Sequence, residues 1–144
     1  MTEIRLPPPP TQAIVTDRWT APFWAAMAQR RLVVAACASC STTRMPPTPF
    51  CPACRSQDID WRALSGNATL YSYTIVVRAV IPGMDDYLPY VPAVVELDGA
   101  GGARLIANVA DCTTGDLAVG MPLRLRWRED ALQPLPYFVP ESIA

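Results

Sequence analysis

The chain has 144 residues, of which 51% are hydrophobic and 17% charged, so it can bury a core and lacks the composition of a disordered protein. The formal net charge is −1, and its distribution leaves neither half of the chain basic enough to bind a nucleic-acid backbone. Histidine and lysine are absent, which excludes histidine-dependent acid–base pairs, Schiff-base lysines and the lysine of a phosphate-binding loop.

The first residues predict an extended arm. Pro7 to Pro10 supply no backbone donors and favour a polyproline-like chain, which either lies on another part of the protein or is disordered. No apolar run approaches the roughly 20 residues that cross a bilayer, and residues 1–10 have no apolar signal core. We therefore expect a cytoplasmic protein that does not enter a membrane.

A helix is predicted from Thr16 to Arg31, with Thr20 as N-cap and Pro22 in the first turn. Its apolar residues recur at helical spacing and form an aromatic face: Trp19, Phe23, Trp24 and Met27. Such a face covers the body of the protein or docks on another chain, and the first is the commoner case. We expect residues 1–31, the arm and this helix, to form the first unit.

Four cysteines predict a metal site in residues 32–62. A short apolar strand, 32–36, leads into Cys37, and the motif reads Cys37-x2-Cys40, ten residues, Cys51-x2-Cys54. Two such knuckles place four thiolates around one ion, and a zinc ion with four protein ligands is structural. Iron in a rubredoxin-like site would use the same ligands, and disulfides are the other alternative, which a cytosolic setting disfavours. We expect one structural zinc ion per chain.

From residue 63 to 144 the pattern changes to period-two alternation. Five strands are expected, with these alternating residues: Thr69, Tyr71, Tyr73, Ile75 and Val77; Ala93, Val95 and Leu97; Leu105, Ala107 and Val109; Leu123, Leu125 and Trp127; and an apolar stretch at 135–139. Five short strands in about 75 residues predict a small closed barrel of the OB type. The expected fold is thus mainly β: an N-terminal helix, a rubredoxin-like zinc ribbon and a five-stranded OB-fold barrel.

Two segments of the barrel region are candidates for ligand binding. Arg124, Arg126 and Arg128 alternate on one strand and could grip phosphates, although a solvated face paired with acids is the more frequent arrangement. The loop 78–92 is long and apolar, as binding loops often are. Its candidate contact residues are Arg78, Met84, Tyr87 and Tyr90. Cys112 has no basic neighbour in sequence, which favours a buried apolar role over a nucleophile.

The chain resembles the family of zinc-ribbon plus OB-fold proteins associated with acyl-CoA metabolism. The resemblance covers nearly the whole length, including the helix around Phe23 and Trp24, both cysteine pairs, residues 108–111 and residues 119–122. One departure is that Ser41 and Arg55 follow the two knuckles, where glycine with positive φ is common. The resemblance implies a non-catalytic partner of thiolase-fold enzymes, such as acyltransferases and sterol side-chain aldolases, that helps to shape a CoA-thioester channel.

Three functional hypotheses follow. The first is an accessory subunit that forms a two-plus-two complex with a thiolase-fold acyl-CoA enzyme and shares its acyl-CoA ligand. Its contacts with the enzyme and the ligand would come from the aromatic helix face, the loop 78–92 and the arginine strand. The second is a single-stranded nucleic-acid-binding module, which the pI near 5.3 disfavours. The third is an independent acyl-CoA enzyme, for which Asp85, Asp86 or Asp111 would have to act as the base. The sequence favours the first and gives no acyl-chain specificity.

Overall fold

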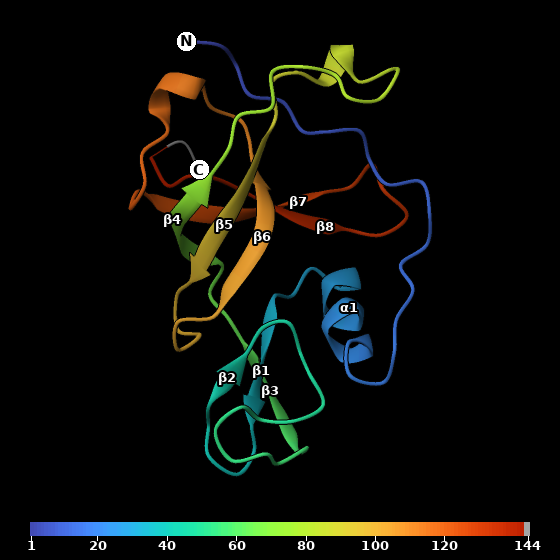
Figure 1. The fold of residues 1–144 in the computed structure, drawn as a ribbon, viewed down its shortest axis with the longest axis vertical. Helices are drawn as coiled ribbons and strands as arrows, with labels where there is room; N and C mark the ends of the chain where they lie inside the picture. The colour runs from blue at the N-terminus through green and yellow to red at the C-terminus, as the bar shows by residue number, and fades with distance from the viewer. Residues whose placement is uncertain (143–144) are drawn as a thin grey trace.

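The computed structural model describes residues 1–142, which form an elongated molecule with a helix and a small sheet at one end and a barrel at the other (Figure 1). The expected fold is confirmed: the structure is mostly β, with one N-terminal α-helix, a three-stranded sheet around the cysteines and a closed five-stranded barrel. Within residues 1–142, no helix has the length and hydropathy needed to cross a membrane.

Helix α1 spans Ala21–Ala28 and is shorter than the predicted segment 16–31. It begins late because the Asp17 carboxylate accepts hydrogen bonds from the N–H groups of Trp19 (2.9 Å) and Thr20 (2.8 Å), which holds this stretch in a turn. Thr20 is the N-cap residue as predicted, but its hydroxyl bonds to Asp17 and caps no helical N–H. The helix ends where Arg30 adopts φ 55°.

The small sheet contains β1 (Val33–Cys37), β2 (Thr43–Arg44) and β3 (Ile59–Ala63) in the order β2-β1-β3. Strand β1 lies in the centre and pairs antiparallel with both neighbours. Each of its five residues is buried, which explains why this stretch reads as a continuous apolar run. The helix packs on this sheet through Phe23, Ala26 and Met27.

The barrel consists of β4 (Asn67–Tyr73), β5 (Val91–Leu97), β6 (Arg104–Val109), β7 (Pro122–Arg128) and β8 (Leu135–Pro140). The strands close in the order β4-β5-β6-β8-β7. Two short 3-10 helices, η1 (Asp85–Tyr87) and η2 (Thr114–Asp116), lie in the connections. The alternation predicted for β5 is confirmed, because Ala93, Val95 and Leu97 are all buried.

The face expected for β4 packs on the core only beyond a bulge, at Tyr73. Ala68 and Leu70 point into the core, whereas Tyr71 is 47% exposed and carries the Arg104 guanidinium 3.7 Å from its ring centroid. The register with β5 shifts between Leu70 and Ser72, and this bulge changes which residues face inward. The strand also ends at Tyr73, so the predicted members Ile75 and Val77 lie beyond it.

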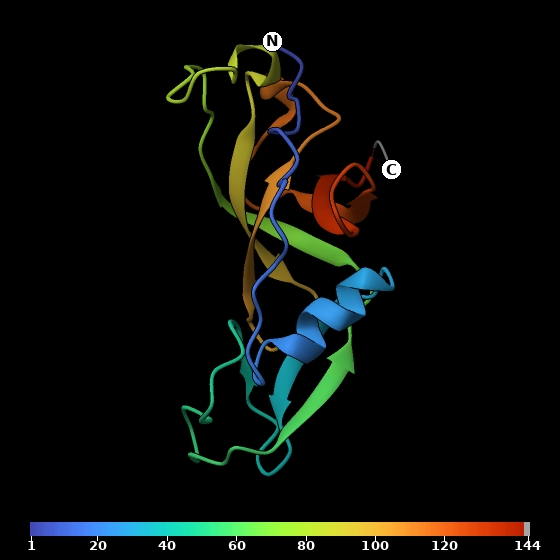
Figure 2. The ribbon, with the colours of Figure 1, turned by 90° about the vertical axis from the view of Figure 1, so that its right-hand side faces the viewer.

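The proline-rich arm lies on the barrel. The Ile4 N–H donates to the Cys112 carbonyl (2.8 Å) and the Arg5 N–H donates to the Pro89 carbonyl (2.9 Å), so the arm adds short β-bridges to the loops there. Ile4 is buried in the same apolar cluster as the barrel residues. Figure 2 shows the arm running from the loop end of the barrel down to α1. The arm thereby connects the two ends of the molecule.

The closure of the barrel generates a stability prediction. Phe138 is fully buried on β8, and its carbonyl accepts the Ala110 N–H (3.0 Å) where β6 meets β8. We expect Phe138→Ala to lower the free energy of unfolding by about 3–5 kcal/mol, since it leaves a cavity at the seam. Urea denaturation measures this change. Val119→Ala, at an exposed position, should change stability by less than about 0.5 kcal/mol, and equal effects of both substitutions would contradict the assigned core.

Candidate functional site

Four cysteines form the densest cluster of ligand atoms among the described residues. The Sγ atoms of Cys37, Cys40, Cys51 and Cys54 all lie within 4.8 Å of one another. Cys37 and Cys54 are 3.5 Å apart at sulfur, and Cys40 and Cys51 are 3.6 Å apart. A tetrahedral zinc site with Zn–S bonds of about 2.3 Å separates its sulfurs by about 3.8 Å, so this arrangement fits a zinc ion closely.

The two knuckles share one backbone geometry. The Ser41 N–H donates to the Cys37 carbonyl (2.8 Å), and the Arg55 N–H donates to the Cys51 carbonyl (2.9 Å). Ser41 and Arg55 both have φ 66°, the left-handed region that glycine adopts at low cost. The departure noted in the sequence therefore leaves the turn unchanged, and both knuckles direct their sulfurs to the same point.

Backbone N–H groups inside the knuckles favour the thiolate at the first cysteine of each pair. Hydrogen bonds from the N–H groups of Cys40 and Ser39 lower the pKa of the Cys37 thiol to about 6, against the opposing effect of desolvation. The N–H groups of Cys54 and Ala53 lower the pKa of Cys51 in the same way. When bound, a divalent metal ion neutralises thiolates of this kind and cross-links their turns. With four protein sulfurs available, zinc would have no open position for water or substrate.

The arginine stripe on β7 is occupied by acids of the same chain. Arg124 lies 3.5 Å from Glu141, and Arg126 lies 3.1 Å from Asp111. Arg128 is buried, makes a two-point contact with Asp130 and also donates to the Pro7 carbonyl (3.0 Å). The stripe therefore has the paired arrangement, and Arg128 holds the arm in place. None of the three is presented as a free phosphate ligand.

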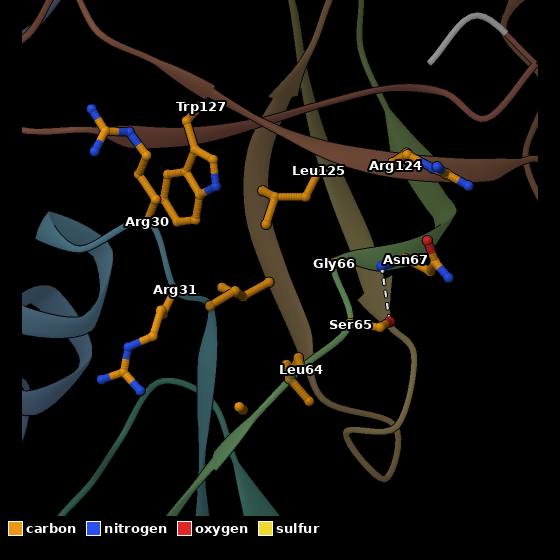
Figure 3. A pocket seen from close by; sticks show the side chains of 11 residues that line it. Arg30, Arg31, Leu64, Ser65, Gly66, Asn67, Arg124, Leu125 and Trp127 are labelled. Carbon is orange, nitrogen blue, oxygen red and sulfur yellow. Dashed lines mark hydrogen bonds between the residues drawn. The ribbon is translucent and has the colours of Figure 1, made fainter.

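A hollow of about 510 Å³ lies between the end of α1, the β3–β4 junction and β7 (Figure 3). Leu64, Leu125 and Trp127 form its apolar floor, and the guanidinium groups of Arg31 and Arg124 lie on opposite flanks. Arg30 also lines it and makes a two-point contact with Glu129. Sequence reasoning did not single out Arg30 and Arg31, because their proximity to β7 comes from tertiary packing alone.

The long loop lies at the end of the barrel away from the small sheet, whereas the helix lies between the small sheet and the barrel (Figure 1). Around η1, Tyr87 is partly exposed, Met84 is half-buried and Tyr90 bridges to Val76 and to the arm. The tip is apolar and open, with Val80 81% exposed. Arg78 lies in the same exposed stretch. The structure thus brings Met84, Tyr87 and Tyr90 together on one loop but separates them from the helix.

The aromatic residues of the helix have different environments. Phe23 is buried and meets Trp24 edge to face, with ring centroids 5.3 Å apart. Trp19 precedes the helix and lies under the Arg18 guanidinium, 4.6 Å from its ring centroid. Phe23 therefore serves mainly self-packing, while half-buried Trp24 lines an outer hollow together with the edges of Phe23 and Met27.

Cys112 lies in the hydrophobic core, outside the four-cysteine cluster. Burial, with the negative charges of Asp116 and Asp111, raises the pKa of its thiol to about 11. A thiol with so high a pKa is almost entirely protonated at neutral pH, so it is a poor nucleophile. This agrees with the apolar role that its sequence context favoured.

Comparisons with known proteins match two family domains to the chain. The sequence model of the ChsH2 rubredoxin-like zinc ribbon domain matches residues 24–60, and that of the ChsH2 C-terminal OB-fold domain matches residues 61–128. A solved structure described as the Ltp2-ChsH2(DUF35) aldolase contains a chain with a TM-score of 0.79 and 37% identity; the match covers 89% of this chain and 98% of that one. The four cysteines thus belong to a zinc-ribbon domain and can hold one zinc ion.

Two curated relatives differ in length. A probable enoyl-CoA hydratase alpha subunit of Thermomonospora curvata is 41% identical over 120 residues, and the match covers 82% of this chain and 36% of the subunit. A DUF35 domain-containing scaffold protein of Methanocaldococcus jannaschii is 28% identical over 117 residues, with 80% of this chain and 81% of that protein covered. This chain therefore spans about a third of the hydratase subunit but most of the scaffold protein.

The metal site yields a first prediction. Cys40→Ser removes one of the four thiolates, so we expect zinc content to fall from one per chain to near zero after brief exposure to a chelator. Unfolding free energy should fall by about 4 kcal/mol or more, because a structural metal contributes directly to folding. Elemental analysis and denaturation measure the two effects. Cys112→Ala should retain the full zinc content. Freshly purified, reduced protein without zinc would contradict the site, and iron in its place would indicate a rubredoxin-like centre.

A second prediction concerns the fifth cysteine. At pH 8, a thiol with a pKa of about 11 is almost wholly protonated, so Cys112 in the folded, zinc-loaded chain should react with iodoacetamide at least about tenfold more slowly than a free thiol. Intact-mass spectrometry with time gives the rate, and the Cys112→Ala variant identifies the labelled site. Rapid single labelling that this variant abolishes would show that Cys112 is an accessible thiolate.

Proposed function

This chain belongs to the ChsH2-type (DUF35) family of zinc-ribbon and OB-fold proteins, and from that premise we propose that it is a non-catalytic accessory subunit of a thiolase-fold acyl-CoA enzyme. The observation that carries the proposal is the likeness to a chain of the Ltp2-ChsH2 aldolase, which extends over 98% of that chain. Because the match covers 89% of this chain, the similarity extends over both the ribbon and the barrel.

The chemistry of the described residues supports a non-catalytic role. The chain has no histidine or lysine, and the Asp111 carboxylate already accepts hydrogen bonds from Tyr137 (2.9 Å) and Arg126 (3.1 Å). Burial and the hydrogen bond to Asp111 raise the pKa of Tyr137, which keeps the phenol protonated. Asp85 and Asp86 lie exposed on η1. No group here is prepared to act as a general base.

In the proposed assembly, the loop end of the barrel contributes to a CoA-thioester channel. Met84, Tyr87 and Tyr90 would line the acyl or pantetheine passage, and Arg78 is the candidate for a CoA phosphate. The exposed apolar tip around Val80 and Ile81 supports this placement, because such a tip is unfavourable in water unless a partner covers it. Arg124, Arg126 and Arg128 are the weaker candidates, since each is already paired with an acid.

The complex is the testable part of the proposal. Co-expression with the Ltp2 chain, the other component named in the related aldolase structure, should give one species on gel filtration with the mass of two chains of each kind by light scattering. This stoichiometry is expected because the proposal takes the partner enzyme to be a dimer in which each subunit binds one accessory chain. Separate elution of the two chains, together with a partner that is soluble and fully active alone, would contradict the accessory role.

A control locates the contribution of the loop. Replacing Val80 and Ile81 together by serine should weaken the complex without loss of zinc, because both side chains are exposed and far from the cysteines. Unchanged affinity would remove the loop tip from the interface and leave the rest of the proposal intact.

A further inference from the structure

An apolar groove of about 560 Å³ runs between α1 and the barrel strand β6. One wall is formed by Thr20, Phe23, Trp24 and Met27 of the helix region with Met45, Pro46 and Pro47 of the ribbon; the other is formed by residues 104–108 of β6 with Leu135 and Pro136. Alternate side chains of a strand point to opposite faces, so five consecutive residues can line one groove only when the strand presents its edge to it.

The hydrogen-bond pattern identifies which groups point into the groove. In β5, the carbonyl of Pro92 accepts from Thr74 (3.1 Å), and Tyr90 exchanges two bonds with Val76, so even-numbered residues of this strand bond toward β4. Odd-numbered residues bond toward β6, as the bond from the Leu97 N–H to the Ala103 carbonyl (3.0 Å) shows. In β6, residues 105 and 107 are therefore bonded to β5.

It follows that Arg104, Ile106 and Asn108 direct their N–H and C=O groups away from β5, toward the groove. Strand β8 meets this side of β6 at a single parallel bridge between Val109 and Phe138. The residues that flank Val109 supply the bonds of such a bridge: the Ala110 N–H donates to the Phe138 carbonyl (3.0 Å), and Asn108 lies on the paired side. Within residues 1–142, no bridge pairs Arg104 or Ile106 with a strand on this side. The barrel is thus closed at the Asn108 end of β6 and leaves an open sheet edge at Arg104 and Ile106.

We propose that this edge accepts an extended, uncharged, apolar segment of the partner enzyme as an added β-strand. Open edges of this kind are templates for strand addition, and proteins normally cover or charge them. Here the edge is not covered: Ile106 is 79% exposed. The charge that the groove lining carries, on Arg104, is engaged by Glu96 (3.8 Å) and the Tyr71 ring.

The groove selects its occupant by shape and by hydrogen bonding. A neighbouring strand lies about 4.8 Å from the edge, and the helix and Met45–Pro47 form an opposite wall that admits a slim chain more readily than a second folded copy. An acyl chain would fill the apolar volume but would leave the outward N–H and C=O groups without partners. A peptide strand satisfies both the apolar wall and the polar edge. This inference rests on the proposed function, because it assigns the strand to the partner enzyme.

Amide hydrogen exchange tests the inference on the full, zinc-loaded chain, alone and with the Ltp2 chain. In the free protein, the amides of Arg104 and Ile106 should exchange rapidly, while those of Leu105 and Ala107, bonded to β5, exchange slowly. In the complex, the two outward amides should slow by at least about tenfold. Complex formation without this protection would overturn the added strand but leave the accessory role standing. Failure of the two chains to associate would overturn both.

Two variants at one position separate backbone pairing from side-chain packing. Ile106→Pro removes an outward N–H without breaking a bond to β5, as edge positions tolerate, and should weaken partner binding by about tenfold. Ile106→Val retains the N–H and most of the side chain and should weaken binding by less than about twofold. If both substitutions weaken binding equally, the contact depends on side-chain packing and not on a backbone hydrogen bond, which would overturn the added strand. Circular dichroism and zinc content verify folding, and if the proline variant misfolds, the exchange result on the unaltered chain decides.

Other occupants give distinct results in the same experiment. Protection of the outward amides by octanoyl-CoA without the partner would assign the groove to an acyl chain. Protection that rises with the concentration of the chain alone would assign it to a second copy. Either outcome would overturn a partner strand.

Discussion

The convergence of four thiols on one point is the constraint on which the rest of the structure depends. The sheet that carries them has strands of five, two and five residues, too few to stabilise themselves without a cross-link. Cys37 ends β1, and β1 is the fully buried centre of the ribbon against which α1 packs. A metal ion at the knuckles therefore orders the strand that positions the helix, and the helix forms one wall of the apolar groove.

A few short contacts between the ribbon and the barrel hold the two parts in a fixed orientation. Strand β3 leads almost directly into β4, and the Gly66 carbonyl between them accepts the Leu125 N–H (2.9 Å) from β7. On the other side, the Thr43 hydroxyl donates to the Ala100 carbonyl (2.6 Å) at the β5–β6 turn. A Cβ at Gly101 would lie 3.0 Å from that hydroxyl, and Gly101 has φ 60°, so glycine suits this close approach. These contacts fix how β6 faces the helix.

Much of the fold could be predicted from local patterns, because the cysteine spacing and the alternation in β5 to β7 involve neighbours in sequence. Features set by single side chains or by long-range contacts could not. Asp17 shortens the helix through its own hydrogen bonds, and the bulge after Leu70 changes the buried face of β4. The hollow between Arg31 and Arg124 and the open edge at Ile106 arise only when ribbon and barrel are packed together.

Many charged side chains among the described residues are paired with one another. We therefore propose that contact with a partner uses apolar surface and the unpaired strand edge. The central claim is that such a chain assists an acyl-CoA enzyme without performing the chemistry. It is tested most directly by following CoA release from short-chain and steroid acyl-CoA thioesters with the pure, zinc-loaded chain. The account predicts release at the uncatalysed rate. Release well above that rate, abolished by Asp111→Asn with zinc content and folding intact, would contradict it.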